Sequence, residues 1–199
     1  MQVLASDNPK LIELIIHGAV GVLPTDTIYG IVCRASDERA VKRLYALKHR
    51  EHKPGTVIAA SIEQLVGLGL KPRYLKAVEQ FWPGPVSVII PCGAELEYLH
   101  LGKLSLAVRI PKDAALQKLL KKTGPLLTSS ANVTKEPPAT VIKEAQAYFD
   151  GQVDFYVDGG DLSGNEPSTI IRIIDDAIEV IREGAVTINE AGRIEPQSP

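Results

Sequence analysis

The sequence has few cysteines, no long apolar run and no excess of positive charge, and each shortage argues against a class of protein. Its two cysteines, Cys33 and Cys92, lie far apart and form no CxxC or CxH pattern, which argues against a disulfide framework or a zinc site. No stretch reaches the roughly 18 uncharged apolar residues of a membrane helix, and the start of the chain lacks the basic-then-apolar order of a signal peptide. We therefore expect a cytoplasmic protein with reduced thiols and no membrane association.

The formal net charge is only −2. A broad surface that tracks the phosphates of nucleic acids is usually strongly basic. We therefore expect any RNA contact to be weak and local.

Several binding signatures are also missing. There is no GxxxxGK[ST] loop, no GxGxxG after a predicted strand and no GxSxG, so a P-loop, a Rossmann site and an α/β-hydrolase are unsupported. His49 and His52 are close in sequence, but Lys48, Arg50 and Lys53 surround them and would repel a metal ion. We expect no metal site built from side chains.

A chain of 199 residues that is 45% apolar is long enough for one compact domain. Capped or proline-initiated apolar patterns at helical spacing predict helices from Pro9 to Gly18, from Asp37 to 48–50, from Ser61, from Pro72 to Phe81, over 113–122 and over 141–149. Short apolar runs predict strands over 19–23, 56–60, 86–90, 105–110, 126–129 and 154–158, and a hairpin whose arms are 168–174 and 177–183. This alternation predicts a single α/β domain with a twisted mixed sheet flanked by helices over residues 1–190, followed by a tail over 191–199.

Several polar segments lie just after predicted strands, which is where α/β sheets usually bind ligands. They are PTDTIYG, KHREHKPG, SLAVRIP, TSSANVTKEPPAT and the hairpin from NEPST to IRE. The PTDTIYG loop at 24–30 offers hydroxyl groups and backbone N–H groups for a small polar ligand, from Thr25, Thr27 and Tyr29. The TSSAN run at 128–132 offers Ser129, Ser130 and Asn132. An ordinary structural turn is an equally good interpretation of each loop.

Four cationic side chains are further candidates for binding a ligand. Lys48 and Arg50 are suited to a triphosphate, although a basic helix end often only complements the helix dipole. Arg109 stands in an otherwise apolar strand, where its charge requires either an anionic ligand or a structural ion pair. Arg182 ends the last strand and either covers a nucleotide or faces solvent.

Taken together, these stretches resemble the YrdC-like family of threonylcarbamoyl-AMP synthases over nearly the whole chain. The matching stretches are PTDTIYG, Lys48-x-Arg50, FWPGP at 81–85, LAVRIP at 106–111, Ser130-x-Asn132, PPAT at 137–140, DGG at 158–160, PST at 167–169 and the IRxG of Arg182 and Gly184. Each motif is weak alone, but the set is specific in its order and spacing.

The resemblance implies a nucleotidyltransferase that converts threonine, bicarbonate and ATP into threonylcarbamoyl-AMP and diphosphate, with Mg²⁺ on the nucleotide. The product would pass to a transferase complex that modifies adenosine 37 of tRNA. The resemblance also implies that Lys48 and Arg50 are catalytic. It assigns contacts with ATP to Lys48, Arg50, Ser105, Asn132, Thr140 and Arg182, and contacts with threonine to Thr25, Arg109, Ser130 and Ser168.

The sequence departs from this family pattern at three places. Glu51 stands where a proline commonly follows Lys-x-Arg, no asparagine precedes Pro54, and Ala59 and Ala60 stand where many members carry a histidine that contacts threonine. One alternative is a module of the same fold that binds double-stranded RNA or the ribosome. Another is a domain cut from a larger sulfur- or carbamoyl-transfer enzyme, but that domain should carry zinc-finger cysteines, which the sequence lacks.

Overall fold

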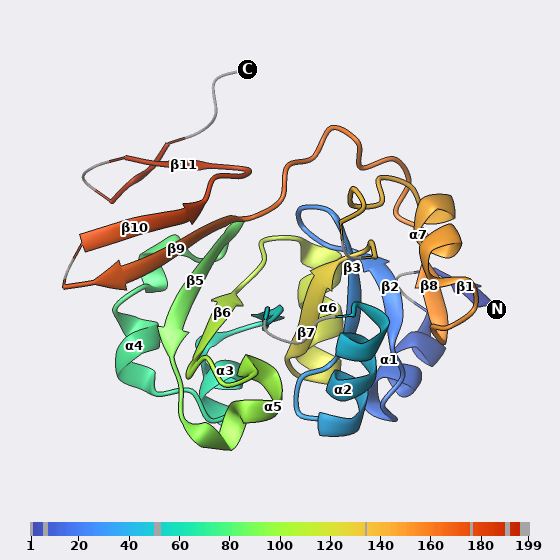
Figure 1. Cartoon of the computed structure of the whole chain (residues 1–199), viewed down its shortest axis with the longest axis horizontal. Helices are drawn as coiled ribbons and strands as arrows, with labels where there is room; N and C mark the ends of the chain where they lie inside the picture. Colours follow the sequence, from blue (N-terminus) through green and yellow to red (C-terminus); the bar gives the residue numbers. More distant parts are fainter. Residues whose placement is uncertain are drawn as a thin grey trace.

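A computed structural model describes residues 2–5, 8–49, 53–133, 135–175, 177–189 and 192–195. The chain forms one α/β domain with a large mixed sheet (Figure 1), so the predicted fold class is confirmed. The strands of the large sheet are β1 (Gln2–Leu4), β2 (Gly21–Pro24), β3 (Tyr29–Arg34), β4 (Thr56–Ile58), β5 (Val86–Pro91), β6 (Ser105–Arg109), β7 (Leu126–Ser130), β8 (Phe155–Val157), β9 (Thr169–Ile174) and β10 (Ala177–Arg182). Their order across the sheet is β1-β8-β2-β3-β7-β4-β6-β5-β9-β10.

The helices of the described residues are α1 (Pro9–Ile16), α2 (Glu38–Leu47), α3 (Ile62–Gly67), α4 (Pro72–Lys76), α5 (Glu97–His100), α6 (Ala114–Thr123) and α7 (Ile142–Phe149), with two 3₁₀ turns, η1 (Glu79–Phe81) and η2 (Ala94–Leu96). Apart from α5, the helices begin close to the predicted starts. Asn8, Asp37, Ser61 and Asp113 each accept a backbone N–H bond at the start of a helix, as expected for these residue types. Among the described residues, no helix is long and apolar enough to cross a membrane.

Alternating side chains divide the core between the two faces of the sheet. Val22, Ile31 and Tyr156 belong to one buried cluster, whereas their chain neighbours Leu23 and Val32 belong to the other. Because successive side chains of a strand point to opposite faces, the clusters lie on the two sides of the sheet. Helices α1 and α6 cover one face, and α2, α3, α4, α5 and α7 contribute to the cluster on the other.

Parts of the observed fold differ from the sequence prediction. The PTDTIYG segment is not wholly a loop, because Tyr29 and Gly30 begin β3, which pairs antiparallel with β2. The helix predicted from Pro72 to Phe81 ends at Lys76, and a separate 3₁₀ turn follows it. Strand β1, helix α5, and the small pair β11 (Thr187–Ile188) and β12 (Ile194–Glu195) were not predicted, since segments this short show no clear period.

The pair of β11 and β12 bears on the predicted tail. Ile194 pairs with Ile188 and Glu195 pairs with Thr187, so two residues of the 191–199 segment contact the segment before it. The division into a domain over 1–190 and a tail over 191–199 stays a prediction.

Candidate functional site

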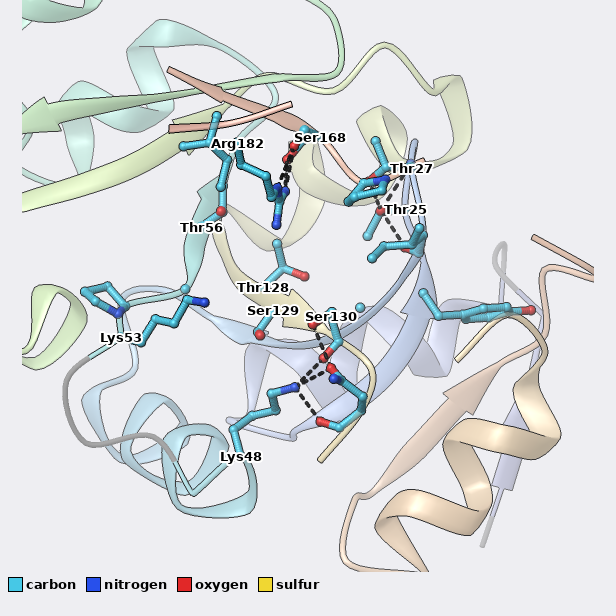
Figure 2. Close-up of a pocket in the computed structure, with 18 of the residues that line it drawn as sticks. Thr25, Thr27, Lys48, Lys53, Thr56, Thr128, Ser129, Ser130, Ser168 and Arg182 are labelled. Carbon is cyan, nitrogen blue, oxygen red and sulfur yellow. Dashed lines mark hydrogen bonds between the residues drawn. The ribbon is translucent and has the colours of Figure 1, made fainter. Parts of the chain in front are cut away.

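A cavity of about 600 Å³ opens where several strand ends meet (Figure 2). The β2–β3 turn, the end of α2, the ends of β6 and β7, and the β9–β10 hairpin all contribute to its wall. Its lining residues are Thr25, Thr27, Ile28, Tyr29, Gly30, Lys48, His49, Lys53, Pro54, Gly55, Thr56, Arg109, Thr128, Ser129, Ser130, Asn132, Lys135, Pro167, Ser168, Ile170 and Arg182. A volume of this size is typical of a site for a nucleotide or another small molecule.

The wall of the cavity is strongly cationic. Five of its described side chains are lysine or arginine, namely Lys48, Lys53, Arg109, Lys135 and Arg182, and none is aspartate or glutamate. The chain as a whole carries a net charge of −2, so the positive charge is concentrated at this site. Such a concentration raises the local density of anions and favours a polyanionic ligand.

Lys48 is buried beside the end of β7 and is only 1% exposed. Its Nζ donates to the Ser130 carbonyl at 2.7 Å, to Asn132 Oδ1 at 2.7 Å and to the Asn132 carbonyl. Asn132 Oδ1 also accepts from the Ser130 hydroxyl at 2.7 Å, as Figure 2 shows. The lysine therefore fixes the Ser130-x-Asn132 turn against α2 and places its positive charge directly beneath that turn.

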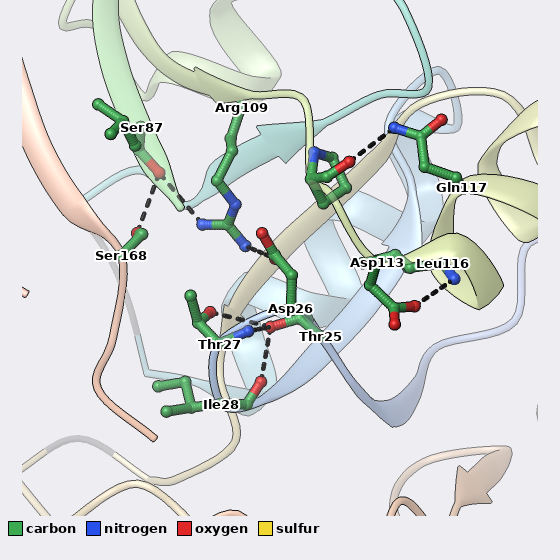
Figure 3. Close-up of polar contacts among 12 residues, drawn as sticks. Thr25, Asp26, Thr27, Ile28, Ser87, Arg109, Asp113, Leu116, Gln117 and Ser168 are labelled. Atoms are coloured by element: carbon green, nitrogen blue, oxygen red, sulfur yellow. Dashed lines mark hydrogen bonds and ion pairs between the residues drawn. The ribbon is translucent and has the colours of Figure 1, made fainter. Parts of the chain in front are cut away.

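Arg109 forms a buried ion pair with Asp26, on the β2–β3 turn (Figure 3). Its Nη2 lies 2.9 Å from Asp26 Oδ1, and the two side chains are 4% and 6% exposed. Burial raises the pKa of Asp26 above its usual value, and the Arg109 guanidinium opposes that rise. The structural ion pair that the sequence allowed is therefore present, and Arg109 also lines the cavity.

A chain of hydrogen bonds leads from Arg109 to the β9–β10 hairpin. Arg109 Nη1 donates to Ser87 Oγ at 3.2 Å, and Ser87 Oγ donates to Ser168 Oγ at 3.0 Å. Arg182 Nη2 donates to both the hydroxyl and the carbonyl of Ser168, at 3.1 and 2.6 Å. Gly184 permits this close approach of the hairpin, because a Cβ there would lie 2.1 Å from the Pro167 carbonyl.

The β2–β3 turn is held by its own hydroxyl groups. Thr25 Oγ1 donates to the Ile28 carbonyl at 2.7 Å and lies 3.0 Å from Thr27 Oγ1. Behind the turn, the Tyr29 hydroxyl accepts from Gly159 N at 2.7 Å and donates to the Gly160 carbonyl at 2.9 Å. These bonds tie the turn to the DGG segment and fix the wall of the cavity on that side.

The structure brings together most of the residues singled out in the sequence. Thr25, Lys48, Arg109, Ser130, Asn132, Ser168 and Arg182 all line the cavity. Arg50 lies outside the described residues.

Two of the expected ATP contacts do not reach the cavity. Ser105 lies at the opposite end of β6 from Arg109, where its hydroxyl donates to the Lys103 carbonyl. Thr140 lies just before α7, and its hydroxyl donates to Glu144. Thr140 belongs to the PPAT motif and Ser105 directly precedes the LAVRIP motif, and a motif does not specify which side chains face the site.

Other cavity residues were missed as candidates. Lys53 and Lys135 contribute charge, and Thr56 and Thr128 contribute polar wall. Gly30 is also required here, because a Cβ at that position would lie 2.4 Å from Thr128 Oγ1. Lys53 was considered only as a group that would repel a metal, and its place on the cavity wall follows from the pairing of β4 with β7.

The described lining side chains are hydroxyl, amide and cationic groups, without a carboxylate. Within the described parts of the chain there is also no group of three or more His, Cys, Asp and Glu side chains arranged to hold a metal. Mg²⁺ usually takes one or two protein carboxylates together with phosphate oxygens and water. The described side chains of the cavity therefore do not fit a magnesium site of their own.

Comparison with known proteins identifies relatives for almost the whole chain. The family profile described as "Telomere recombination", for Sua5, YciO and YrdC, matches residues 13–184. A protein of Methanocaldococcus jannaschii that is provisionally named threonylcarbamoyl-AMP synthase is 31% identical over 193 residues, covering 94% of this chain and 92% of that protein. The threonylcarbamoyl-AMP synthase of Bacillus subtilis is 30% identical, covering 92% of this chain and 56% of that protein.

A solved structure of P. abyssi Sua5 complexed with L-threonine is also similar. It superposes with a TM-score of 0.80 at 28% sequence identity, covering 90% of this chain and 54% of that chain. The chain therefore spans about half the length of the B. subtilis and P. abyssi proteins, and nearly all of the M. jannaschii protein.

Proposed function

The chain belongs to the Sua5/YciO/YrdC family, and from that premise we propose that it is a threonylcarbamoyl-AMP synthase. The proposed reaction converts threonine, bicarbonate and ATP into threonylcarbamoyl-AMP and diphosphate. The observation that carries the proposal is the cavity itself, whose described wall holds five lysine and arginine side chains and no carboxylate. A nucleoside triphosphate with an amino acid beside it matches both the volume and the charge of such a site.

We assign the amino acid to the side of the cavity formed by Thr25, Arg109 and Ser168. Ser168 Oγ accepts from Ser87 and from Arg182, and its own proton has no acceptor among the described residues. A carboxylate or hydroxyl oxygen of threonine can accept that proton. Arg109 would contribute a donor that Asp26 and Ser87 do not use, since a guanidinium carries five N–H groups.

We assign the nucleotide to the side formed by Lys48, Asn132 and Arg182, whereas Ser130 keeps its proposed contact with threonine. The short contacts of Lys48 to the Ser130-x-Asn132 turn keep a positive charge beneath the groups that would contact the phosphates. On the opposite side of the cavity, Arg182 is fixed by its hydrogen bonds to Ser168. Arg50, outside the described residues, keeps its proposed role on ATP.

The chemistry suits a site without a covalent nucleophile. The amine of threonine and bicarbonate condense to a carbamate with loss of water. A carbamate oxygen then attacks the α-phosphorus, and the bond to the β-phosphate breaks to release diphosphate. Phosphoryl-transfer reactions of this kind depend mainly on positioning and on neutralising charge, which is what the cations and hydroxyl groups of the cavity supply.

We further propose that the product passes to a separate transferase complex that modifies adenosine 37 of tRNA. The relatives that carry the name threonylcarbamoyl-AMP synthase support this assignment.

Diphosphate release from ATP tests the proposed function directly. The purified chain is incubated with ATP and Mg²⁺, with and without threonine and with and without bicarbonate. We expect release only when both co-substrates are present, and we expect threonylcarbamoyl-AMP as the product by mass spectrometry. Equal release without threonine would reject the function.

A matched pair of arginine variants from one hairpin supplies the control. Arg182 lines the cavity, whereas Arg172 lies on the outer surface of β9 and pairs with Glu179. We expect Arg182→Met to lose most of the diphosphate release and Arg172→Met to retain it. Equal losses in the two variants would show that the assay reports on the stability of the hairpin instead.

A further inference from the structure

Lys135 differs from the other cations of the cavity wall. Lys48, Arg109 and Arg182 donate to protein groups, and Lys53 also interacts within the chain. For Lys135, which is exposed, the described part of the chain offers no hydrogen-bond or ion-pair partner. Its ammonium can therefore bind a ligand without giving up a protein contact.

The backbone at Lys135 is strained. Its φ is 79°, in the left-handed region, which is unfavourable for a residue with a Cβ. Glu136 N donates to the Val133 carbonyl at 3.2 Å, so Lys135 is the third residue of a four-residue turn. A φ near +80° at that position is typical of a type II turn, where glycine or asparagine is usual. A lysine at such a position is less stable than glycine would be, and functional sites are where such strain is commonly found.

The same turn is fixed to the polar groups on the nucleotide side. Asn132 Nδ2 donates to the Glu136 carbonyl, and Asn132 Oδ1 accepts from Lys48 Nζ. Asn132 and Glu136 are thus held together beside the end of α2 and the end of β7. Lys135 therefore lines the cavity from an anchored turn, and its side chain is exposed to solvent.

We propose that Lys135 binds the diphosphate portion of the nucleotide, the β- and γ-phosphates, and this inference rests on the function proposed above. The amino acid and the α-phosphorus must meet in the interior, near Arg109 and Ser168. The leaving diphosphate departs toward solvent, and Lys135 is an exposed residue of the cavity wall. Lys135 is a substrate-binding residue in this scheme and takes no part in bond breaking.

Binding calorimetry with ATP, inorganic triphosphate and AMP tests this inference, using two variants with different backbone effects. Lys135→Met removes the charge and keeps the strained backbone, whereas Lys135→Gly removes the charge and relieves the strain. We expect both variants to bind ATP and inorganic triphosphate about three- to tenfold more weakly, because one exposed charge-assisted contact is lost. Affinity for AMP should change by less than about twofold, and Lys135→Arg should keep the wild-type affinities.

Stability separates the ligand contact from a structural role. Lys135→Gly should melt at the wild-type temperature or about 1–3 °C above it, because glycine tolerates the left-handed backbone. Asp175→Gly, at an exposed turn with φ 49° outside the cavity, should show a similar thermal effect without any change in triphosphate binding. Lys103→Met, an exposed lysine outside the cavity, controls for the loss of one positive charge.

Unchanged triphosphate affinity in Lys135→Met would overturn the inference, and so would an equal loss of affinity for AMP. A wild-type chain that fails to bind triphosphate would overturn it as well. A different result would reject the proposed function. If the chain binds triphosphate through Lys135 but releases no diphosphate with threonine, the phosphate site is supported and the proposed reaction is rejected.

Discussion

The buried pair of Arg109 and Asp26 supports a quantitative prediction for the variant Arg109→Met. The pair is separated by 2.9 Å and is almost inaccessible to solvent. Asp26 Oδ2 is also buried, without a hydrogen-bond partner among the described groups. Methionine keeps most of the volume of the arginine side chain but removes its charge, and it leaves the Asp26 carboxylate without its cation.

The expected loss of stability is large. Removing one partner of a buried ion pair typically costs about 3–5 kcal/mol, because the remaining charge is buried without compensation. For 199 residues, an unfolding entropy of about 2.1 cal/mol/K per residue gives about 0.42 kcal/mol/K in total. The melting temperature of Arg109→Met at pH 7 should therefore fall by about 7–12 °C.

The loss should also depend on pH. Burial raises the pKa of Asp26 above 3.8, so the contribution of this carboxyl to stability is present below pH 3.8 and is lost as the pH rises through its folded-state pKa. Arg109 opposes the rise in pKa, and without it the folded-state pKa moves further up. The penalty of Arg109→Met relative to wild type should thus be smallest near pH 4 and should grow toward pH 7.

Thermal melts of a double-mutant cycle at several pH values provide the measurement. Asp26→Asn removes the negative charge with little change in shape, so the double variant Arg109→Met/Asp26→Asn should recover about 1.5 kcal/mol or more of the loss at pH 7. Its remaining penalty should not grow from pH 4 to pH 7, in contrast to that of Arg109→Met, because the Asp26 charge is absent. A penalty for Arg109→Met that is the same at all pH values, or two single losses that simply add, would refute the reasoning.

Three further predictions concern specificity, folding and reactivity. Diphosphate release should be at least about tenfold less efficient with valine than with threonine, because hydroxyl groups of the cavity would lose a hydrogen-bond partner. Comparable efficiency with the two amino acids would show that the site recognises shape alone. Tyr29→Phe should lower the free energy of unfolding by about 1–3 kcal/mol in chemical denaturation, because it leaves the amide of Gly159 and the carbonyl of Gly160 without their partner. An unchanged midpoint and slope of the denaturation curve would contradict this. Burial raises the pKa of the Cys33 thiol and raises that of Cys92 to about 11. Iodoacetamide at pH 8 should therefore label both thiols slowly in the native protein and rapidly after unfolding. Rapid labelling of the native protein would disprove this prediction.

The local structure was largely predictable from the sequence. Asn8, Asp37 and Ser61 were expected to cap helices and do so, because an N-cap depends on hydrogen bonds within three residues of the chain. The hairpin of β9 and β10 was also predicted from two apolar runs around a turn. The requirement that Arg109 be paired or bind an anion followed from its apolar strand alone.

The tertiary structure decided which of the candidate groups meet. Asp26 reaches Arg109 across 83 residues of sequence, and Lys48 reaches Asn132 across 84, because the strand order places β3, β7, β4 and β6 side by side. Ser105 and Thr140 are not among the lining residues of the cavity, and their hydroxyl groups donate to the Lys103 carbonyl and to Glu144. Caps and turns are determined by neighbouring residues, and the sequence by itself was sufficient for them. Strand order depends on burying all the apolar faces at once, so only the folded chain shows which side chains share the cavity.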